Sequence, residues 1–320
     1  MASSEPDELC ALHLQEDYFE FFEFHVEGIL ATGRSGQVFL ASSKKYQGIT
    51  RAVKIISTKT GDLKMRGLTL EQVKEAFYRE VGILKYINHQ YILSGVNGVV
   101  CPDYLALTMD YCNHGTLASR MRVVDDGKMY VLTKCLIKAI EFLHSRRIVH
   151  GDIKPTKILL IGEGLQLRPV VAGFSAAYRL PQHCNLVSTY GKTAGFIAPE
   201  AKKKTDYVDP LKCDSFAVGT VMWCMIQRRC PPDFTKNYAA EALHYPIVSD
   251  LIRYLLLALL CDDPTRRIPM TEALRLINII SLEDCKPDLR SSLQPERSLG
   301  QQNCAEKISG YSRYEKYRMI

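Results

Sequence analysis

The sequence lacks the features that would place the protein in a membrane or outside the cell. Its longest apolar run, Leu255 to Cys261, is too short to cross a bilayer, and the acidic N-terminus has neither the basic nor the apolar region of a signal peptide. The 11 cysteines form no C-x-x-C pair, and 320 residues far exceed a disulfide-stapled secreted domain. We therefore expect reduced thiols, no membrane contact and a cytoplasmic protein, with the nucleus as the alternative location.

Concentrated positive charge is also missing. The formal net charge is only +6, and the basic side chains are scattered apart from Lys202-Lys203-Lys204. Such a triplet is typical of a solvated loop, so we expect no nucleic-acid binding. What the chain does have is 47% hydrophobic residues over 320 positions, enough for a sizeable core in two lobes or two domains.

Residues 150–160 read H-G-D-I-K-P-T-K-I-L-L, and the other motifs are arranged around them. They resemble the catalytic loop of eukaryotic protein kinases, H-R-D-L-K-x-x-N followed by an apolar strand. By this resemblance Asp152 is the catalytic base and Lys154 its companion lysine. Gly151 replaces the arginine that receives an activation-segment phosphate, and Lys157 replaces the asparagine that binds a magnesium ion.

Residues 28–41 resemble the Gly-rich loop of the same family, G-x-G-x-x-G-x-V. Ala31 stands at the first glycine, Gly33 and Gly36 match the second and third, and Val38 matches the valine. Glycine matters there because the backbone approaches phosphates closely and bends where a Cβ would obstruct it. On its own this stretch is also compatible with a plain hairpin.

Residues 51–56, R-A-V-K-I-I, resemble the family strand V-A-I-K, whose lysine, here Lys54, pairs with the α- and β-phosphates. A capping box at Thr69 then opens a predicted helix, and Glu80 lies on its apolar face at the position of the family's αC glutamate. A carboxylate on an apolar face needs a partner to offset its desolvation. Lys54 is the natural candidate.

A strand at 104–109 resembles the one that leads into the kinase hinge. Met109 would be the gatekeeper, and the backbone from Asp110 to Cys112 would bind an adenine edge. Val38, Ala52 and Leu159 resemble the apolar positions that contact adenine. The resemblance therefore implies the following nucleotide-binding set: Ala31, Gly33, Gly36, Val38, Ala52, Lys54, Glu80, Met109, Asp110, Cys112 and Leu159.

Four further matches follow the catalytic loop. Gly173-Phe174-Ser175 occupies the place of the D-F-G motif, so the metal-binding aspartate is absent. Thr193 resembles the threonine that meets the loop aspartate and lysine, and Asp214 resembles the buried aspartate of helix αF. Glu200, in A-P-E, and Arg267, in D-P-T-R-R, resemble an architectural ion pair.

The resemblance implies an α+β fold of two lobes. We expect a β-rich N-lobe with one helix at 18–112 and a mostly helical C-lobe at 113–281, between a flexible leader at 1–17 and a flexible tail at 282–320. Within the N-lobe, alternation in Y-F-E-F-F-E-F at 18–24 predicts an edge strand, and the polar residues 57–67 predict a loop.

The departures remove the ligands of two divalent ions that normally neutralise the triphosphate. Magnesium needs oxygen ligands, whereas Gly173 has no side chain and Lys157 has no lone pair to give. An ammonium within about 4 Å of a dication costs on the order of several kcal/mol even at an effective dielectric near 20. We expect no magnesium and no other metal site, and ATP is a candidate ligand that would bind without metal.

Three interpretations stay open. The first is a pseudokinase, catalytically impaired, that acts as an allosteric regulator or scaffold by binding a protein partner, with an active kinase as one candidate. The second is an active serine/threonine kinase that transfers the γ-phosphate of ATP with atypical metal use, since Lys54, Glu80 and Asp152 are kept. The third is a structural module that binds no nucleotide. Lys154 and Thr193 favour the serine/threonine over the tyrosine type.

Overall fold

The computed structural model describes residues 24–33, 36–44, 46–162, 167–183, 185–188, 190–191, 193–202, 207–231 and 249–280. Contacts divide the chain into two units, Met1–Pro287 and Asp288–Ile320, and every described residue belongs to the first. The expected leader and tail lie outside the described residues. The same holds for all but the last residue of the expected strand at 18–24, and for Lys203 and Lys204.

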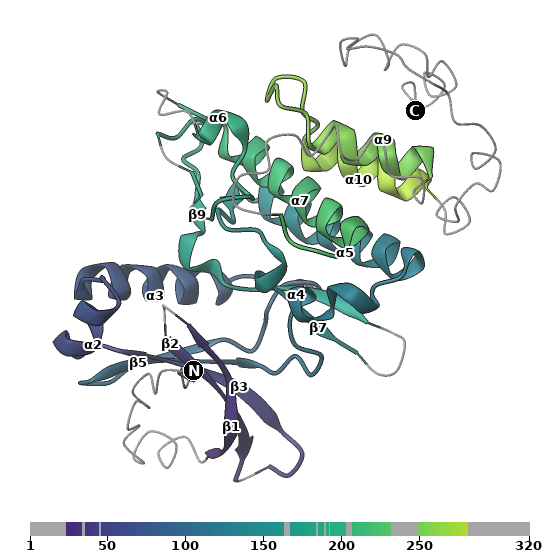
Figure 1. Cartoon of the computed structure of the whole chain (residues 1–320). Helices are drawn as coiled ribbons and strands as arrows, with labels where there is room; N and C mark the ends of the chain where they lie inside the picture. Colours follow the sequence, from purple (N-terminus) through teal and green to yellow (C-terminus); the bar gives the residue numbers. More distant parts are fainter. Residues whose placement is uncertain are drawn as a thin grey trace, which may run out of the picture. The chain divides into compact units, whose positions relative to one another are not determined.

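A five-stranded antiparallel sheet forms the N-terminal part, in the order β1-β2-β3-β5-β4 (Figure 1). Successive side chains of a strand point to opposite faces, so β3 sends Val53 and Ile55 to a small core and Ala52 and Ile56 to the main core. The bounds of the strands are β1 (Phe24–Gly33), β2 (Gly36–Ser43), β3 (Thr50–Ser57), β4 (Asn97–Val100) and β5 (Tyr104–Asp110).

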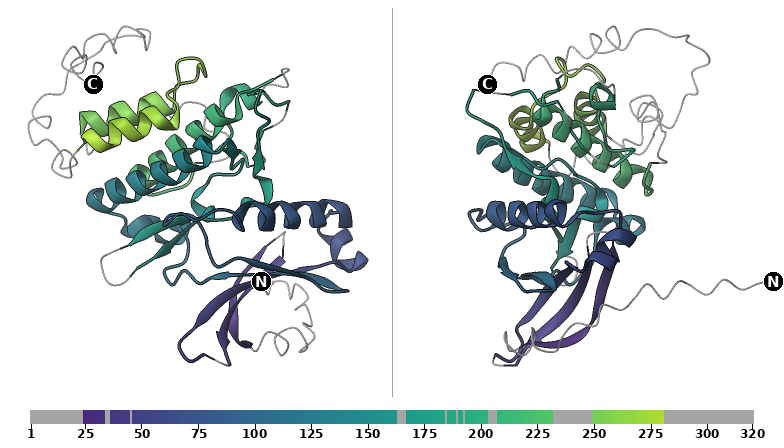
Figure 2. Two further views of the ribbon diagram at one scale, coloured as in Figure 1. Left: turned by 180° about the vertical axis from the view of Figure 1, so that it is seen from behind. Right: turned by 90° about the vertical axis from the view of Figure 1, so that its left-hand side faces the viewer.

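Helix α3 (Leu70–Leu84) packs between the sheet and the rest of the molecule, with β5 on one side and a short 3-10 turn, η3 (Phe174–Ala176), on the other (Figures 1 and 2). It begins at the predicted capping box, where Thr69 Oγ1 accepts from the Gln72 N–H at 3.2 Å. The Gln72 side chain accepts from the Thr69 N–H at 3.0 Å. The helix carries Glu80 on its buried face, which the sequence pattern predicted.

The prediction of a loop at 57–67 is wrong, because a short helix, α2 (Thr60–Met65), lies there. One apolar side chain, Leu63, is buried in the main core and anchors this helix. A single buried residue in a polar stretch leaves no periodicity for sequence reasoning to detect.

Helices form the C-terminal part. Their bounds are α4 (Leu117–Arg120), α5 (Asp126–Ser145), α6 (Pro199–Lys202), α7 (Pro210–Gln227), α9 (Asp250–Leu259) and α10 (Met270–Ile279), with a 3-10 turn η1 (Met121–Val123) after α4. Helix α7 is buried on nearly all sides, which its almost continuous apolar sequence dictates, and α5 and α9 pack against it (Figures 1 and 2). The α+β class with a sheet-rich and a helical lobe is confirmed.

Two small sheets of two antiparallel strands each follow α5 in the chain. Strand β6 (Ile148–Val149) pairs with β9 (Tyr178–Arg179), and β7 (Ile158–Ile161) pairs with β8 (Arg168–Val171). A 3-10 turn, η2 (Pro155–Lys157), leads into β7. Because this pairing sets the start of β7 against the end of β8, the residue before β7 and the residues after β8 become neighbours.

None of the helices within the described ranges is both long and apolar enough to span a membrane.

Candidate functional site

Lys54 and Glu80 form the expected ion pair, with Lys54 Nζ 2.7 Å from Glu80 Oε2 and side chains only 12% and 4% exposed. Glu80 Oε1 also accepts from the Phe174 N–H at 3.1 Å, which ties α3 to the segment after β8. Burial raises the pKa of Glu80, but the charge and hydrogen bond of Lys54 and the charge of Lys157 outweigh it and hold the pKa below its usual value. Glu80 is therefore an ionised, fully engaged anchor.

Asp152, Lys154 and Thr193 meet in a closed triangle. Asp152 Oδ1 accepts from Lys154 Nζ at 2.9 Å and from Thr193 Oγ1 at 2.7 Å. Lys154 Nζ also donates to Thr193 Oγ1 at 2.6 Å. The resemblance implied this meeting, and the base position is therefore held by two donors.

Asp214 of α7 holds the backbone that leads into this triangle. Its fully buried carboxylate accepts from the N–H groups of His150 at 2.8 Å and Gly151 at 3.1 Å. The side chains of His144 and Tyr190 donate to it at 3.1 and 2.5 Å. Burial raises the pKa of Asp214, yet His144, His150 and Tyr190 together keep it below the usual range. Sequence reasoning missed Tyr190, which matches no family motif quoted above.

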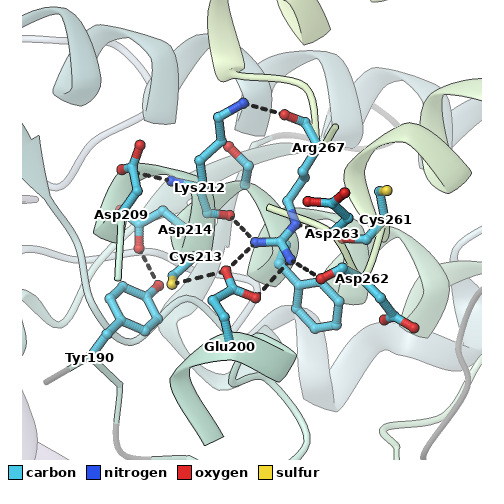
Figure 3. A network of polar contacts seen from close by, with 12 residues as sticks. Tyr190, Glu200, Asp209, Lys212, Cys213, Asp214, Cys261, Asp262, Asp263 and Arg267 are labelled. Carbon is cyan, nitrogen blue, oxygen red and sulfur yellow. Dashed lines mark hydrogen bonds and ion pairs between the residues drawn. The ribbon is translucent and has the colours of Figure 1, made fainter. Parts of the chain in front are cut away.

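Figure 3 shows the second architectural anchor, in which Arg267 binds Glu200 through two parallel hydrogen bonds of 2.6 and 2.9 Å. Its guanidinium, 0% exposed, also donates to the carbonyls of Lys212 and Cys261, each at 2.9 Å. Cys213 Sγ donates to Glu200 at 3.4 Å. The predicted Glu200–Arg267 pair is confirmed, and every polar group of the pair has a partner.

Lys157 and Gly173 are neighbours because β7 and β8 pair, with Ile158 opposite Val171. The Ala172 N–H donates to the Lys157 carbonyl at 2.9 Å. A Cβ added to Gly173 would lie 2.5 Å from Lys157 Cδ and 2.8 Å from its Nζ. The lysine side chain therefore fills the space that the missing aspartate side chain would occupy.

Lys157 is the exceptional charge of the site. It is half-buried, and within the described ranges no hydrogen bond or ion pair reaches its Nζ, whereas Lys54 and Lys154 are both paired. Burial lowers the pKa of Lys157 and the charge of Lys54 lowers it further, while Asp152 and Glu80 offset only part of the fall. Three ammonium groups thus face two carboxylates.

The positions expected to contact adenine all belong to, or pack against, the main core cluster. Ala52, Met109 and Cys112 are buried in the main core, and Val38 and Leu159 pack against the same cluster. Strand pairing sets Ala52 opposite Met109. All five side chains are apolar, as the expected adenine-contacting positions require.

Asp110 differs from the expectation only in what its side chain does. Its carboxylate binds Arg51 and accepts from Ser94 Oγ at 2.6 Å, and the Asp110 N–H donates to the Ser94 carbonyl at 3.1 Å. The Asp110 side chain therefore joins β3 to the segment between α3 and β4. The hinge resemblance places an adenine edge against the backbone from Asp110 to Cys112, and this stays a prediction.

The Gly-rich turn joins β1 and β2, with Ala31 opposite Val38 and Gly33 opposite Gly36. Residues 34 and 35, at its tip, lie outside the described residues. Gly36 has φ +131°, and a Cβ there would overlap the carbonyl oxygen of Ile55. This glycine is required by the close approach of β2 to β3, whatever the turn binds.

The family's metal pair does not fit the residues present. Position 173 offers no ligand atom, and position 157 brings an ammonium to the place where an oxygen donor is needed. In the part of the chain that the structure describes, no three His, Cys, Asp or Glu side chains gather in a way that could hold a metal ion.

Comparison with known proteins agrees with this geometry. Residues 24–276 match the family described as protein kinase domain. The chain is 28% identical over 272 residues to CBL-interacting serine/threonine-protein kinase 16 of Arabidopsis thaliana, covering 79% of this chain and 55% of that protein. It is 26% identical over 257 residues to CBL-interacting protein kinase 16 of Oryza sativa subsp. japonica, covering 77% and 54%. The chain thus spans about half the length of these two relatives.

A shorter match, 30% identical over 156 residues, relates the chain to serine/threonine-protein kinase 10 of Danio rerio. It covers 48% of this chain and 15% of that protein.

Proposed function

The chain belongs to the protein kinase family, and we propose that within it the protein is a pseudokinase that regulates or scaffolds a protein partner instead of transferring phosphate. One observation carries the proposal: the Lys157 side chain fills the space beside Gly173, where the family places an aspartate and its metal. An ammonium there repels a divalent ion, and no oxygen ligand compensates for the repulsion.

The kinetic consequence follows from how phosphoryl transfer works. Positioning and charge neutralisation lower its barrier, and metal ions supply several kcal/mol of that effect. Since each tenfold in rate corresponds to about 1.4 kcal/mol, losing both metal ligands slows transfer by roughly three or more orders of magnitude. Asp152 keeps its geometry with Lys154 and Thr193, but it has little left to activate.

The ligand we propose is an adenine nucleotide. The apolar side chains at positions 38, 52, 109 and 159 suit an adenine ring, and Lys54, oriented by Glu80, supplies a cation for phosphates. The chain's own residues therefore bind and orient the nucleotide. Its transfer chemistry would need a metal that these residues do not accommodate.

We propose that nucleotide binding stabilises the conformation of the surface that binds the protein partner. Glu80 links α3 to Phe174, so a ligand that engages Lys54 also acts on the position of α3. An active kinase is one candidate partner, in the cytoplasm or the nucleus. The two buried anchors, Asp214 and Arg267, keep the C-terminal part folded without metal.

A phosphotransfer assay tests the proposal. Purified protein is incubated with labelled ATP, a generic protein acceptor and either magnesium or manganese, beside a Lys54→Met variant. We expect no labelling of the acceptor above the level of the variant. Labelling that depends on metal and disappears in Lys54→Met would show that the protein is a catalyst.

A serine/threonine kinase with atypical metal use is the second candidate, and the intact triangle of Asp152, Lys154 and Thr193 favours it. Two of the three named relatives are described as serine/threonine-protein kinases. This alternative predicts slow turnover that Asp152→Asn abolishes. A pseudokinase predicts that Asp152→Asn leaves the background unchanged.

A further inference from the structure

We propose that Lys157 makes the nucleotide site selective for metal-free nucleoside triphosphate, so that magnesium weakens binding instead of supporting it. This inference rests on the proposed function, because it concerns the same site in a protein that does not use metal for transfer.

Among the described residues, Lys157 has no anionic partner. Lys54 pairs with Glu80 at 2.7 Å and Lys154 with Asp152 at 2.9 Å, whereas no described group pairs with Lys157 Nζ. A cation that is partly removed from water is stabilised by an anion within hydrogen-bond reach. The described part of the free protein does not supply one, so the phosphates of a nucleotide would gain this interaction.

The charged side chains around Lys157 set the net charge of the site. Lys54, Lys154 and Lys157 face Glu80 and Asp152, which leaves one positive charge. With an aspartate at 173 and a neutral residue at 157, two ammonium groups would face three carboxylates, and the site would be negative. The two departures therefore turn a site that attracts cations into one that attracts anions.

The net charge of the site decides between metal-free ATP and its magnesium complex. Metal-free ATP carries about four negative charges near neutral pH, and its magnesium complex carries about two, so a positive site favours the metal-free form. The lysine also fills the space beside Gly173, where the family's metal-binding aspartate would stand. Lys157 thus gains an interaction with the free triphosphate and loses it with the complex.

The Lys157 side chain and Gly173 fit one another sterically. Its stem passes where a side chain on Gly173 would stand, with Cδ at 2.5 Å and Cε at 3.0 Å from the position of an added Cβ. Gly173 has φ +77° and ψ 56°, in the left-handed region that glycine adopts without strain. The glycine therefore leaves room for the lysine, and the two positions act as one unit.

Calorimetric and thermal-shift titrations with ATP test the inference. Each is run in EDTA and in excess magnesium at matched ionic strength, on the wild type, Lys157→Met and Lys85→Met. Lys85 is exposed at the end of α3, so its variant removes the same charge from solvent. Adenosine serves as the probe that has no phosphate and reports whether the adenine surface is intact.

We expect the wild type and Lys85→Met to bind ATP in EDTA about tenfold or more tightly than in magnesium. Lys157→Met should lose about tenfold of its affinity for ATP in EDTA and lose the opposition by magnesium, with adenosine binding unchanged. Tighter binding with magnesium in the wild type, no ATP binding in either condition, or equal ATP affinities of the wild type and Lys157→Met would each overturn the inference.

A double variant, Lys157→Asn with Gly173→Asp, supplies the reciprocal test. It restores the ligand pattern of the family, so magnesium should now strengthen ATP binding. An unchanged opposition by magnesium would contradict the assignment to Lys157. These binding results are independent of the phosphotransfer assay: metal-dependent labelling would refute the pseudokinase, whereas magnesium-supported binding without labelling would refute only the inference.

Discussion

The molecule treats buried charge in two opposite ways. Around Arg267 and Asp214, each charged group is removed from water and meets donors or acceptors on several sides. Around Gly173, the ammonium of Lys157 is half-buried with no partner in the described ranges. In the first region Asp214, Glu200 and Arg267 match the protein kinase pattern, and the second region departs from it at both metal-binding positions.

The comparison teaches which requirements are separable. Holding the catalytic loop in place needs Asp214, because its carboxylate accepts from the backbone of the loop itself. Binding a metal needs oxygen atoms at 157 and 173, and the fold forms without them. A chain can therefore keep the kinase architecture while it changes the charge of the site, since different side chains carry the two tasks.

Breaking the Arg267–Glu200 pair should have the largest effect on the free energy of unfolding. Arg267→Met leaves the partly buried Glu200 carboxylate without its two guanidinium donors, and we expect a loss of about 3 kcal/mol in the free energy of unfolding. Urea unfolding followed by circular dichroism measures it. Arg266→Met is the matched control, because its side chain is exposed and should change stability by less than about 0.5 kcal/mol. Equal midpoints for the two variants would contradict the contrast.

Lys54→Met should have the next largest effect, about 2 kcal/mol, since Glu80 stays buried but keeps the Phe174 N–H and the charge of Lys157 nearby. A double-mutant cycle with Glu80→Gln checks the value. We expect the double variant to be more stable than the sum of the single losses predicts, because no unpaired charge remains. Strict additivity would show that the pair contributes nothing.

The residues that form the two ion pairs, Glu200–Arg267 and Lys54–Glu80, were largely predictable from sequence. Glu200, Arg267, Lys54 and Glu80 each sit in a motif with fixed spacing, and a carboxylate on an apolar helix face demands a cation. The fold class and the Thr69 capping box were predictable for similar reasons, since local chemistry and motif order agree there.

The unpredicted features depend on tertiary placement. The loss of oxygen ligands at 157 and 173 could be read from the sequence, but the filling of one position by the other could not, because the β7–β8 pairing decides it. Tyr190 reaches Asp214 from 24 residues away in the chain, and no local pattern encodes that distance. Helix α2 depends on one buried leucine.

Acid should lower the free energy of unfolding, because it protonates the paired carboxylates. The folded-state pKa values of Glu80, Glu200 and Asp214 are lowered, so their stabilisation is complete above the ordinary carboxyl pKa of about 4 and is lost as the pH falls through the lower folded values. Burial lowers the pKa of His150, so stability also falls once the unfolded histidine gains a proton below about pH 6.5. Unfolding free energies measured from pH 8 to pH 3 should fall below about pH 6.5, and a flat profile would contradict the assignment.

Lys157→Met should have the smallest effect on stability and the opposite sign. Methionine keeps the stem that packs beside Gly173 and removes a half-buried charge without a partner, so we expect the ligand-free protein to gain about 1 kcal/mol. The gain should shrink at alkaline pH, because the lowered pKa of Lys157 makes the unfolded wild type bind more protons just below the ordinary lysine pKa of about 10.4. The urea midpoints of the two proteins, compared at pH 7 and pH 10 without nucleotide, measure both effects. A destabilised variant would mean that the ammonium already stabilises the fold, and the two regions would then treat charge in the same way.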